Sequence, residues 1–257
     1  MADPESLYRY VKINSKDRVQ GTSSNFSIDL SQDQTTHKVH EVHIMSASIL
    51  HNFYNITTNN SSLVVIGSIG GLNVFSVSEG FYTTTELLAE LKTQIDAFYA
   101  PTTITFTQDP LTNKISYTAV GENISFVSVG DNALSTMAPN LGITTTTPSA
   151  LTGTFSDTPS LNGVEHVYIQ SSKLNGNPTV TSRGGVFDDT FLAMPVRVPY
   201  GFLITYQAQA AHQEQITYNT IRDLSTLDIR ITDDDGNELD VGDNHEFVLV
   251  LKFFYIP

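Results

Sequence analysis

Three histidines spaced three residues apart, His37, His40 and His43, are the side chains whose types and spacing most suggest metal binding. Their surroundings predict an extended segment, and residues three apart in a strand point to opposite faces of the sheet. Two imidazoles that share an ion from one strand need a spacing of two, which is missing here. We therefore predict solvated histidines at a strand edge rather than a metal site.

An acidic run between Asp233 and Asp243 is the second candidate for ion chemistry. If Gly236 takes the glycine position of a helix–loop–helix calcium site, the first and last ligand positions fall on Ile231 and Gly242, which offer no side-chain ligand. An Asp-Asp-Gly-Asn sequence is typical of a tight turn. We interpret the run as a turn between two apolar strands and expect no bound metal.

Side chains for catalysis are also missing from the sequence. There is no cysteine, which excludes thiol catalysis, disulfides and thiolate zinc sites. No nucleophile elbow, phosphate-binding glycine loop or zinc-protease motif occurs. We therefore expect no catalytic residues, no cofactor and no enzymatic activity. Tryptophan, which sugar-binding platforms favour, is absent too, although 11 Tyr and 14 Phe provide other aromatic faces.

The charge is strongly acidic, with a formal net value of −14 and only two basic against ten acidic residues between positions 39 and 172. Such a surface repels phosphate backbones, so we expect no nucleic-acid binding by the main body. No run of about 18 apolar residues occurs, and we expect no membrane span. The first residues lack the basic and apolar regions of a signal peptide, so we expect no secretion through one.

Most of the chain alternates short apolar runs with polar turns, a pattern typical of β-strands. We predict strands at residues 25–30, 39–54, 63–66, 72–77, 164–171, 191–198, 202–207, 215–218, 227–231 and 247–256. We count roughly eight of these as main strands outside an insertion, and eight strands with long connections suit a two-sheet jelly roll. The predicted fold class is all-β, a single jelly-roll β-sandwich.

One segment departs from this pattern, at residues 82–99, where apolar side chains recur at helical spacing. Thr83 followed three residues later by Glu86 matches a capping box. Two more strands follow, at 103–107 and 114–120, so we expect a small α+β insertion. The predicted organisation is an N-terminal arm at 1–22, the jelly roll at 23–78 and 157–257, and the inserted α+β subdomain with its linker at 79–156.

The final strand is apolar on both of its faces. Phe247, Leu249, Leu251, Phe253 and Tyr255 alternate with Val248, Val250, Phe254 and Ile256, and only Lys252 interrupts the second set. A strand with one wet face should alternate apolar with polar residues. One set must fill the sandwich core, and we expect the other set, Val248, Val250, Phe254 and Ile256, to be covered by another subunit or by the N-terminal arm; cover by the insertion is the less favoured alternative.

Several short motifs together resemble the penton, or minor capsid, proteins of virophages and related Polinton-type viruses. They are residues 11–18 (VKINSKDR), 25–30 (NFSIDL), 79–88 (EGFYTTTELL), 198–201 (VPYG), 224–231 (LSTLDIRI) and 247–255 (FVLVLKFFY). The resemblance covers most of the chain through degenerate motifs. It implies a homopentamer at the icosahedral vertex of a virion, contact with the viral major capsid protein, and assembly in the cytoplasm of a host cell.

A second function, from a different class, stays open at this point. The turns are rich in Asn, Ser and Thr, and an insertion on a vertex would face outward. These features favour a glycan- or receptor-binding β-sandwich module that contacts a host surface. The two functions are compatible, because a vertex protein can also carry a receptor-binding unit.

Overall fold

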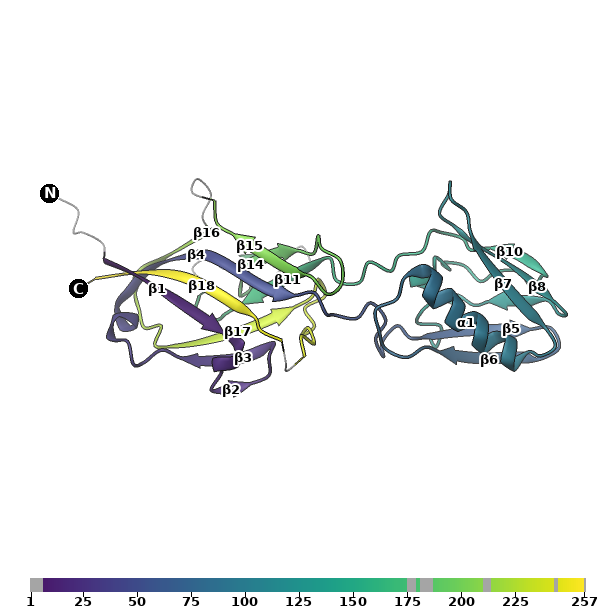
Figure 1. The fold of residues 1–257 in the computed structure, drawn as a ribbon, viewed down its shortest axis with the longest axis horizontal. Helices are drawn as coiled ribbons and strands as arrows, with labels where there is room; N and C mark the ends of the chain where they lie inside the picture. The colour runs from purple at the N-terminus through teal and green to yellow at the C-terminus, as the bar shows by residue number, and fades with distance from the viewer. Residues whose placement is uncertain (1–6, 175–178, 181–186, 210–213, 243–244, 257) are drawn as a thin grey trace. The chain divides into compact units, whose positions relative to one another are not determined.

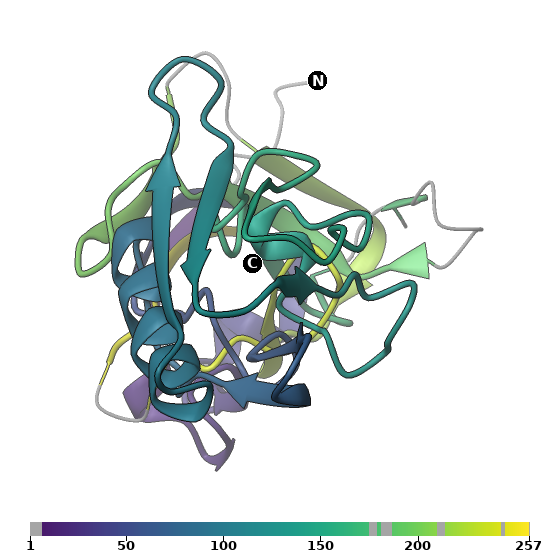
Figure 2. The same ribbon diagram turned by 90° about the vertical axis from the view of Figure 1, so that its right-hand side faces the viewer.

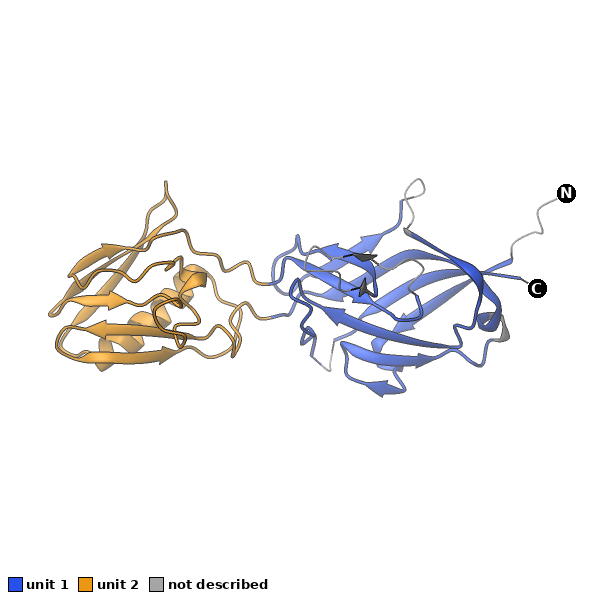
Figure 3. Cartoon of the chain, turned by 180° about the vertical axis from the view of Figure 1, so that it is seen from behind, with its two compact units in different colours: residues 1–53, 164–257 blue, residues 54–163 orange. Residues whose placement is uncertain are grey.

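The computed structural model describes residues 7–174, 179–180, 187–209, 214–242 and 245–256 of the chain. The chain forms two compact units, which Figure 3 draws in blue and orange. We call residues 1–53 and 164–257 the sandwich unit, and residues 54–163 the inserted unit. Each unit has its own buried apolar core, and no buried core residue is shared between the two clusters.

Among the described residues, two five-stranded antiparallel sheets form the body of the sandwich unit (Figure 1). The first sheet has the order β1-β18-β4-β15, with β16 also paired to β4, and its strands are β1 (Leu7–Asn14), β18 (Val248–Tyr255), β4 (Val39–Leu50), β15 (Leu203–Gln207) and β16 (Glu214–Arg222). The second sheet has the order β14-β11-β17-β3-β2, with β14 (Thr190–Pro195), β11 (His166–Gln170), β17 (Thr226–Thr232), β3 (Asn25–Asp29) and β2 (Gln20–Gly21). Two short strands, β12 (Thr179–Val180) and β13 (Phe187–Asp188), pair with each other.

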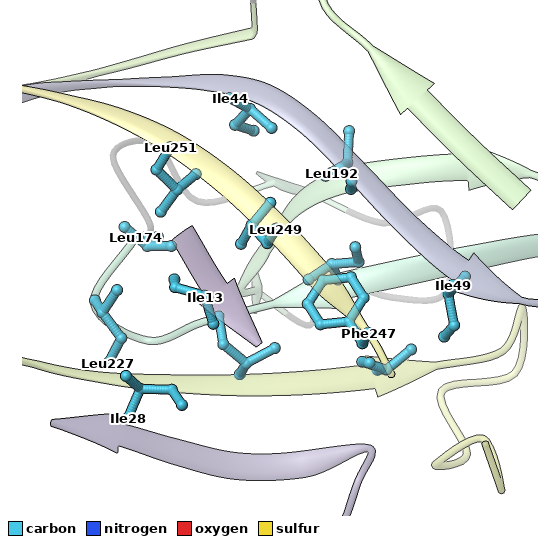
Figure 4. Packing of buried hydrophobic residues seen from close by; sticks show 14 of the residues in the cluster. Ile13, Ile28, Ile44, Ile49, Leu174, Leu192, Leu227, Phe247, Leu249 and Leu251 are labelled. Atoms are coloured by element: carbon cyan, nitrogen blue, oxygen red, sulfur yellow. The ribbon is translucent and has the colours of Figure 1, made fainter. Parts of the chain in front are cut away.

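Alternate residues of both sheets point into one core, where Ile13, Ile44 and Leu249 of the first sheet meet Ile28 and Leu227 of the second (Figure 4). The 3-10 helices η1 (Ser15–Asp17) and η2 (Gln34–Lys38) each connect a strand of one sheet to a strand of the other. Two antiparallel sheets that share one core make a β-sandwich of the jelly-roll class. The predicted all-β fold class is thereby confirmed.

The structure gives the segment predicted as an arm a different role. Residues 7–14 form strand β1, which pairs with β18 along its whole length, from Leu7 opposite Tyr255 to Asn14 opposite Val248. The physical reason is that Val11 and Ile13 alternate with polar residues and enter the sandwich core, where Ile13 is 1% exposed. Residues 1–6 of the predicted arm lie outside the described residues.

The turn predicted between two apolar strands forms, but it does not join the strands as a hairpin. Gly236 adopts a left-handed conformation (φ +84°), and the Asp233 side chain accepts backbone N–H groups within the turn. Strands β17 and β18 on either side of it belong to different sheets. The segment between them crosses from one sheet to the other because buried Leu239 and Val241 anchor it in the core.

The inserted unit has two three-stranded antiparallel sheets and one α-helix (Figures 1 and 2). One sheet has the order β6-β5-β9, with β5 (Ser62–Gly67), β6 (Gly71–Ser76) and β9 (Ile124–Phe126); the other has the order β10-β8-β7, with β7 (Thr103–Gln108), β8 (Ile115–Val120) and β10 (Thr152–Thr154). A 3-10 helix, η3, spans Pro139–Leu141. The unit is wider than the predicted insertion at 79–156, because β5 and β6 pair with each other and β5 pairs with β9.

Helix α1 (Thr84–Phe98) begins where the sequence predicts it. Thr83 is the N-cap, and its side chain and that of Glu86 form the reciprocal bonds of a capping box. Leu87, Leu91 and Ile95 bury their side chains in the core of the inserted unit. Among the described residues, no helix is both long enough and apolar enough to span a membrane.

Candidate subunit-interface surface

The side chains of β18 that the sequence analysis selected lie on the side of the first sheet that faces away from the core. Val248, Val250 and Phe254 alternate with buried Leu249, Leu251 and Phe253. We call this side of the sheet the outer face, and it is formed by Tyr8, Tyr10, Lys12 and Asn14 of β1, Val248, Val250, Lys252 and Phe254 of β18, and Glu41, His43, Ser46 and Ser48 of β4. Val248, Val250 and Phe254 are half-buried within the single chain.

Ile256 lies just beyond the end of β18. Its side chain is 45% exposed, and its backbone N–H donates to the carbonyl of Lys38 at 3.2 Å. The structure therefore brings Val248, Val250 and Phe254 together on one face, with Ile256 at the end of the same strand. Strand β1, which falls within the predicted arm, lies beside β18 in the sheet and does not lie over it.

Three aromatic rings and one lysine gather at one end of the outer face. The Lys252 ammonium lies 3.9 Å from the ring centroid of Tyr8 and 4.7 Å from that of Phe254, which is the geometry of a cation–π contact. The Tyr8 ring lies 6.1 Å from that of Phe254 and 5.9 Å from that of Tyr10. Tyr8 and Tyr10 remain 54% and 56% exposed, so large aromatic area is available for a partner.

Tyr8 and Tyr10 are not among the predicted interface residues, because their segment is predicted to be an arm. A signal was present, since Tyr8, Tyr10 and Lys12 alternate with Val11 and Ile13 at the period of a strand. The cross-strand register places Tyr8 opposite Phe254 and Tyr10 opposite Lys252. Residues from the two ends of the described chain therefore form one surface.

The three histidines do not converge. His43 is on the outer face, where its ring lies 4.7 Å from that of Phe254 and its Nε2 pairs with the Glu41 carboxylate. His40 stands at a β-bulge, where the partner of β18 shifts from Glu41 to Val39. His37 pairs with Asp223 at 3.1 Å. No group of three or more His, Cys, Asp or Glu side chains in the described part of the chain could hold a metal ion.

Asp234, in the acidic turn, makes structural bonds. Its carboxylate accepts the backbone N–H groups of Glu165 at 2.9 Å and His166 at 3.1 Å, and it lies 3.0 Å from Nδ1 of the His166 ring. Burial raises the pKa of Asp234, but these donors outweigh it and hold the pKa below its ordinary value. The carboxylate thus ties the turn after β17 to the start of β11.

The described residues form a β-sandwich whose outer face carries exposed aromatic and half-buried apolar side chains. No protein-family model matches the chain, and no curated protein matches it in sequence. The chain is similar to a solved structure, that of the mavirus penton protein, with a TM-score of 0.55 and 12% sequence identity over 97% of this chain and 100% of that one. At this identity the similarity establishes the fold, which is penton-like across almost the whole chain.

Proposed function

We propose that this chain is a structural capsid protein that forms the pentameric vertex, or penton, of an icosahedral virion. The observation that carries the proposal is the fold match, which extends over both units and spans the full length of a penton protein. A jelly roll alone hosts many functions. A jelly roll interrupted by a second compact unit, matched from end to end, is a much narrower resemblance.

The outer face is the proposed contact between subunits, with Val248, Val250, Phe254 and Ile256 joined by Tyr8 and Tyr10. Apolar side chains on β18, aromatic rings on β1 and β18, and polar side chains such as Lys12 beside them are a composition typical of a protein interface. A stable contact needs roughly 800 Å² from each partner. Exposed aromatic rings supply buried area at low conformational cost.

The free edge of β1 adds to this surface. Ser15 N–H bonds to the Phe247 carbonyl, so the alternating pattern of an antiparallel ladder directs the backbone groups of Tyr8, Tyr10 and Lys12 away from β18. Among the described residues, β1 pairs on its other side with no strand. A neighbouring subunit that covers this edge would satisfy these donors and acceptors.

Charge opposes the assembly and makes it dependent on salt. Five copies of a chain with net charge −14 carry a formal charge of −70. Repulsion between exposed charges is screened beyond about 8 Å at physiological ionic strength. We therefore expect pentamers to form more readily as the salt concentration rises.

Native mass spectrometry and light scattering across a salt series test the proposal. Val250→Glu places a carboxylate on the outer face and is expected to abolish the pentamer. Val19→Glu is the matched control, because Val19 is an exposed valine (62%) outside this face. A wild-type chain that stays monomeric at high salt and high concentration argues against the proposal, and equal effects of the two variants would reject the outer face as the contact.

The same proposal includes contact with the viral major capsid protein and a location in the virion, since a vertex pentamer is held by the shell around it. Co-sedimentation of the purified pentamer with assembled major capsid protein tests this contact. The expected result is binding by the wild-type pentamer. Absence of co-sedimentation by intact pentamers would remove this part of the proposal and leave the pentamer itself standing.

A further inference from the structure

The inserted unit has an apolar strip on its β5–β6 hairpin that the packing of the unit leaves uncovered. Leu72 and Val74 of β6 are 54% and 36% exposed, Ile66 opposite Leu72 is 37% exposed, and Ile69 in the connecting turn is 83% exposed. The opposite side of the hairpin, with Phe75 among its residues, packs into the core with helix α1. We call Ile66, Ile69, Leu72 and Val74 the hairpin strip.

The backbone groups of Leu72 and Val74 in β6 are available at the same place. Val77 donates its N–H to the Ser61 carbonyl, so these two residues form a hydrogen-bonded pair. Because such pairs alternate along an antiparallel ladder, the N–H and C=O groups of Leu72, Val74 and Ser76 point away from β5, toward the free edge. The Ser76 carbonyl confirms this direction, because Gln94 of α1 donates to it at 3.1 Å. Within residues 54–163, all of which are described, no strand pairs with β6 on that edge.

The turn at the end of the hairpin is held rigidly. The buried Glu122 carboxylate accepts the backbone N–H groups of Ile69 at 2.6 Å and Gly70 at 3.1 Å, and the Tyr99 hydroxyl donates to the Gly71 carbonyl at 2.8 Å. A Cβ atom at Gly70 would meet the Tyr99 ring at 2.5 Å. The exposed Ile69 is therefore presented on a preorganised support, which lowers the entropic cost of binding.

Proteins usually protect edge strands with charged side chains, prolines or bulges. Strand β6 has the sequence Gly-Leu-Asn-Val-Phe-Ser and carries none of these. We propose that β6 is a docking edge that accepts an extended polypeptide segment as an additional strand, with alternate apolar side chains of that segment on the hairpin strip.

Charge identifies the occupant as a basic segment. The inserted unit carries two lysines and eight acidic residues, a net charge of −6. Both lysines are engaged within the unit, Lys92 with Asp96 and Lys114 with the Ser156 carbonyl. Glu90 accepts from Gln94, the residue that reaches the end of β6. Two copies pairing through β6 would bring two units of charge −6 together, so the favoured partner is a basic segment and not a second copy.

Fluorescence anisotropy with the full chain tests this proposal. The probe is a fluorescein-labelled synthetic peptide of about nine residues in which lysine alternates with valine, and the counter-probe replaces lysine with glutamate. The lysine–valine peptide is expected to bind and the glutamate–valine peptide to bind at least about tenfold more weakly. Failure of the lysine–valine peptide to bind, or equal binding of both, would overturn the proposal.

Variants locate the site. Leu72→Lys is expected to weaken binding by at least about tenfold, whereas Val120→Lys, which adds the same charge at another exposed apolar residue (65%) of the inserted unit, should change it by less than about threefold. Val74→Pro removes an edge N–H and is expected to match Leu72→Lys. Equal losses from Leu72→Lys and Val120→Lys would overturn the edge assignment, as would a dimer, seen by sedimentation, that Leu72→Lys dissociates. Val250→Glu should leave peptide binding intact, because this site is independent of the proposed pentamer.

Discussion

In the sandwich unit two sheets cover each other, whereas in the inserted unit helix α1 packs into one core with strands of two three-stranded sheets. The sandwich core draws on strands far apart in the sequence, such as β1 and β18. The inserted core is assembled from residues 54–163 alone. Local assembly explains why the sequence pattern predicts helix α1 and strands β7 and β8 so closely, since these elements follow one another directly.

The uncovered faces of the two units also differ. On the outer face of the sandwich unit, Lys252 lies against Tyr8 and Phe254, and polar residues flank Val248 and Val250. On the hairpin strip, Leu72 and Val74 have no charged neighbour within β5 or β6. The two surfaces therefore differ in polarity: the outer face mixes apolar with charged side chains, whereas the hairpin strip is apolar and lies beside an unpaired strand edge.

Because the two units have separate cores, we expect them to unfold separately. Substitutions in the cores should give the largest effects on stability and the strongest test of this difference between the units. Phe247 is fully buried and packs against Phe26, with ring centroids 6.4 Å apart. Phe247→Ala should destabilise the sandwich unit by about 3–5 kcal/mol, and Leu91→Ala the inserted unit by about 2–5 kcal/mol. Hydrogen exchange measured by mass spectrometry during a urea titration resolves the two units. If each substitution lowers both units equally, the cores are not independent.

The support under the hairpin strip gives the next largest effect. Glu122→Gln removes the negative charge that accepts the N–H groups of Ile69 and Gly70, and should cost about 1.5–3 kcal/mol. Amide exchange of Ile69 and Gly70 should rise with it. The control is Glu79→Gln, because Glu79 is exposed and accepts one backbone N–H, that of Thr58. If Glu79→Gln lowered the free energy of unfolding by as much, burial of Glu122 would add nothing to the stabilisation by its hydrogen bonds.

Helix α1 has no counterpart in the sandwich core, and its N-cap offers a smaller test. Thr83→Ala removes the capping box and should destabilise the inserted unit by about 1 kcal/mol without affecting the sandwich unit. Thr93→Ala in the middle of the same helix should change stability by only a few tenths of a kcal/mol, because alanine is the better helix former there. Urea midpoints of the inserted unit measure both variants, and equal losses would contradict the capping role.

The smallest effect is a pH dependence confined to the sandwich unit. The folded-state pKa of Asp234 lies below its ordinary value of about 3.9, so its contribution is present above that value and is lost as the pH falls through the folded pKa. The side chain is 38% exposed, and solvent screening limits the contribution to less than about 1 kcal/mol. Asp234→Asn should lower stability near neutral pH. In a plot of the urea midpoint against pH, the fall at acidic pH should be shallower for this variant than for the wild type. If the fall at acidic pH were the same in the variant and the wild type, the contribution assigned to Asp234 would be contradicted.

Much of the fold could be predicted from the sequence because the local patterns are strong. The capping box at Thr83 and Glu86, the strand at 25–30 and the final strand at 247–256 all appear close to their predicted positions. Strand β1 was not predicted, because charged Arg9 stands in the same phase as Val11 and Ile13 and leaves their alternation only two apolar residues long. The partners of β5 and β6 could not be predicted either, since sheet membership depends on long-range pairing that periodicity does not encode.

Only some residues of the outer face could be predicted from the sequence. The pattern of β18 indicated that Val248, Val250 and Phe254 share a face, and the structure shows them doing so. The pattern of β18 did not indicate that Tyr8 and Lys252 would lie together, because that contact depends on the register between β1 and β18. The free edge of β6 was hidden for the same reason, since an edge is defined by the strands that do not pair with it.

The position of β18 between β1 and β4 has a consequence for synthesis on the ribosome. Every residue of the inserted unit leaves the ribosome long before β18 does, although β1 and β4 leave earlier still. Domains generally fold as they emerge, at rates of about 5–20 residues per second of translation. The inserted unit can therefore fold before the sandwich is complete. Until β18 is synthesised, the apolar residues of β1 and β4 stay exposed, because β18 is the strand that pairs with both.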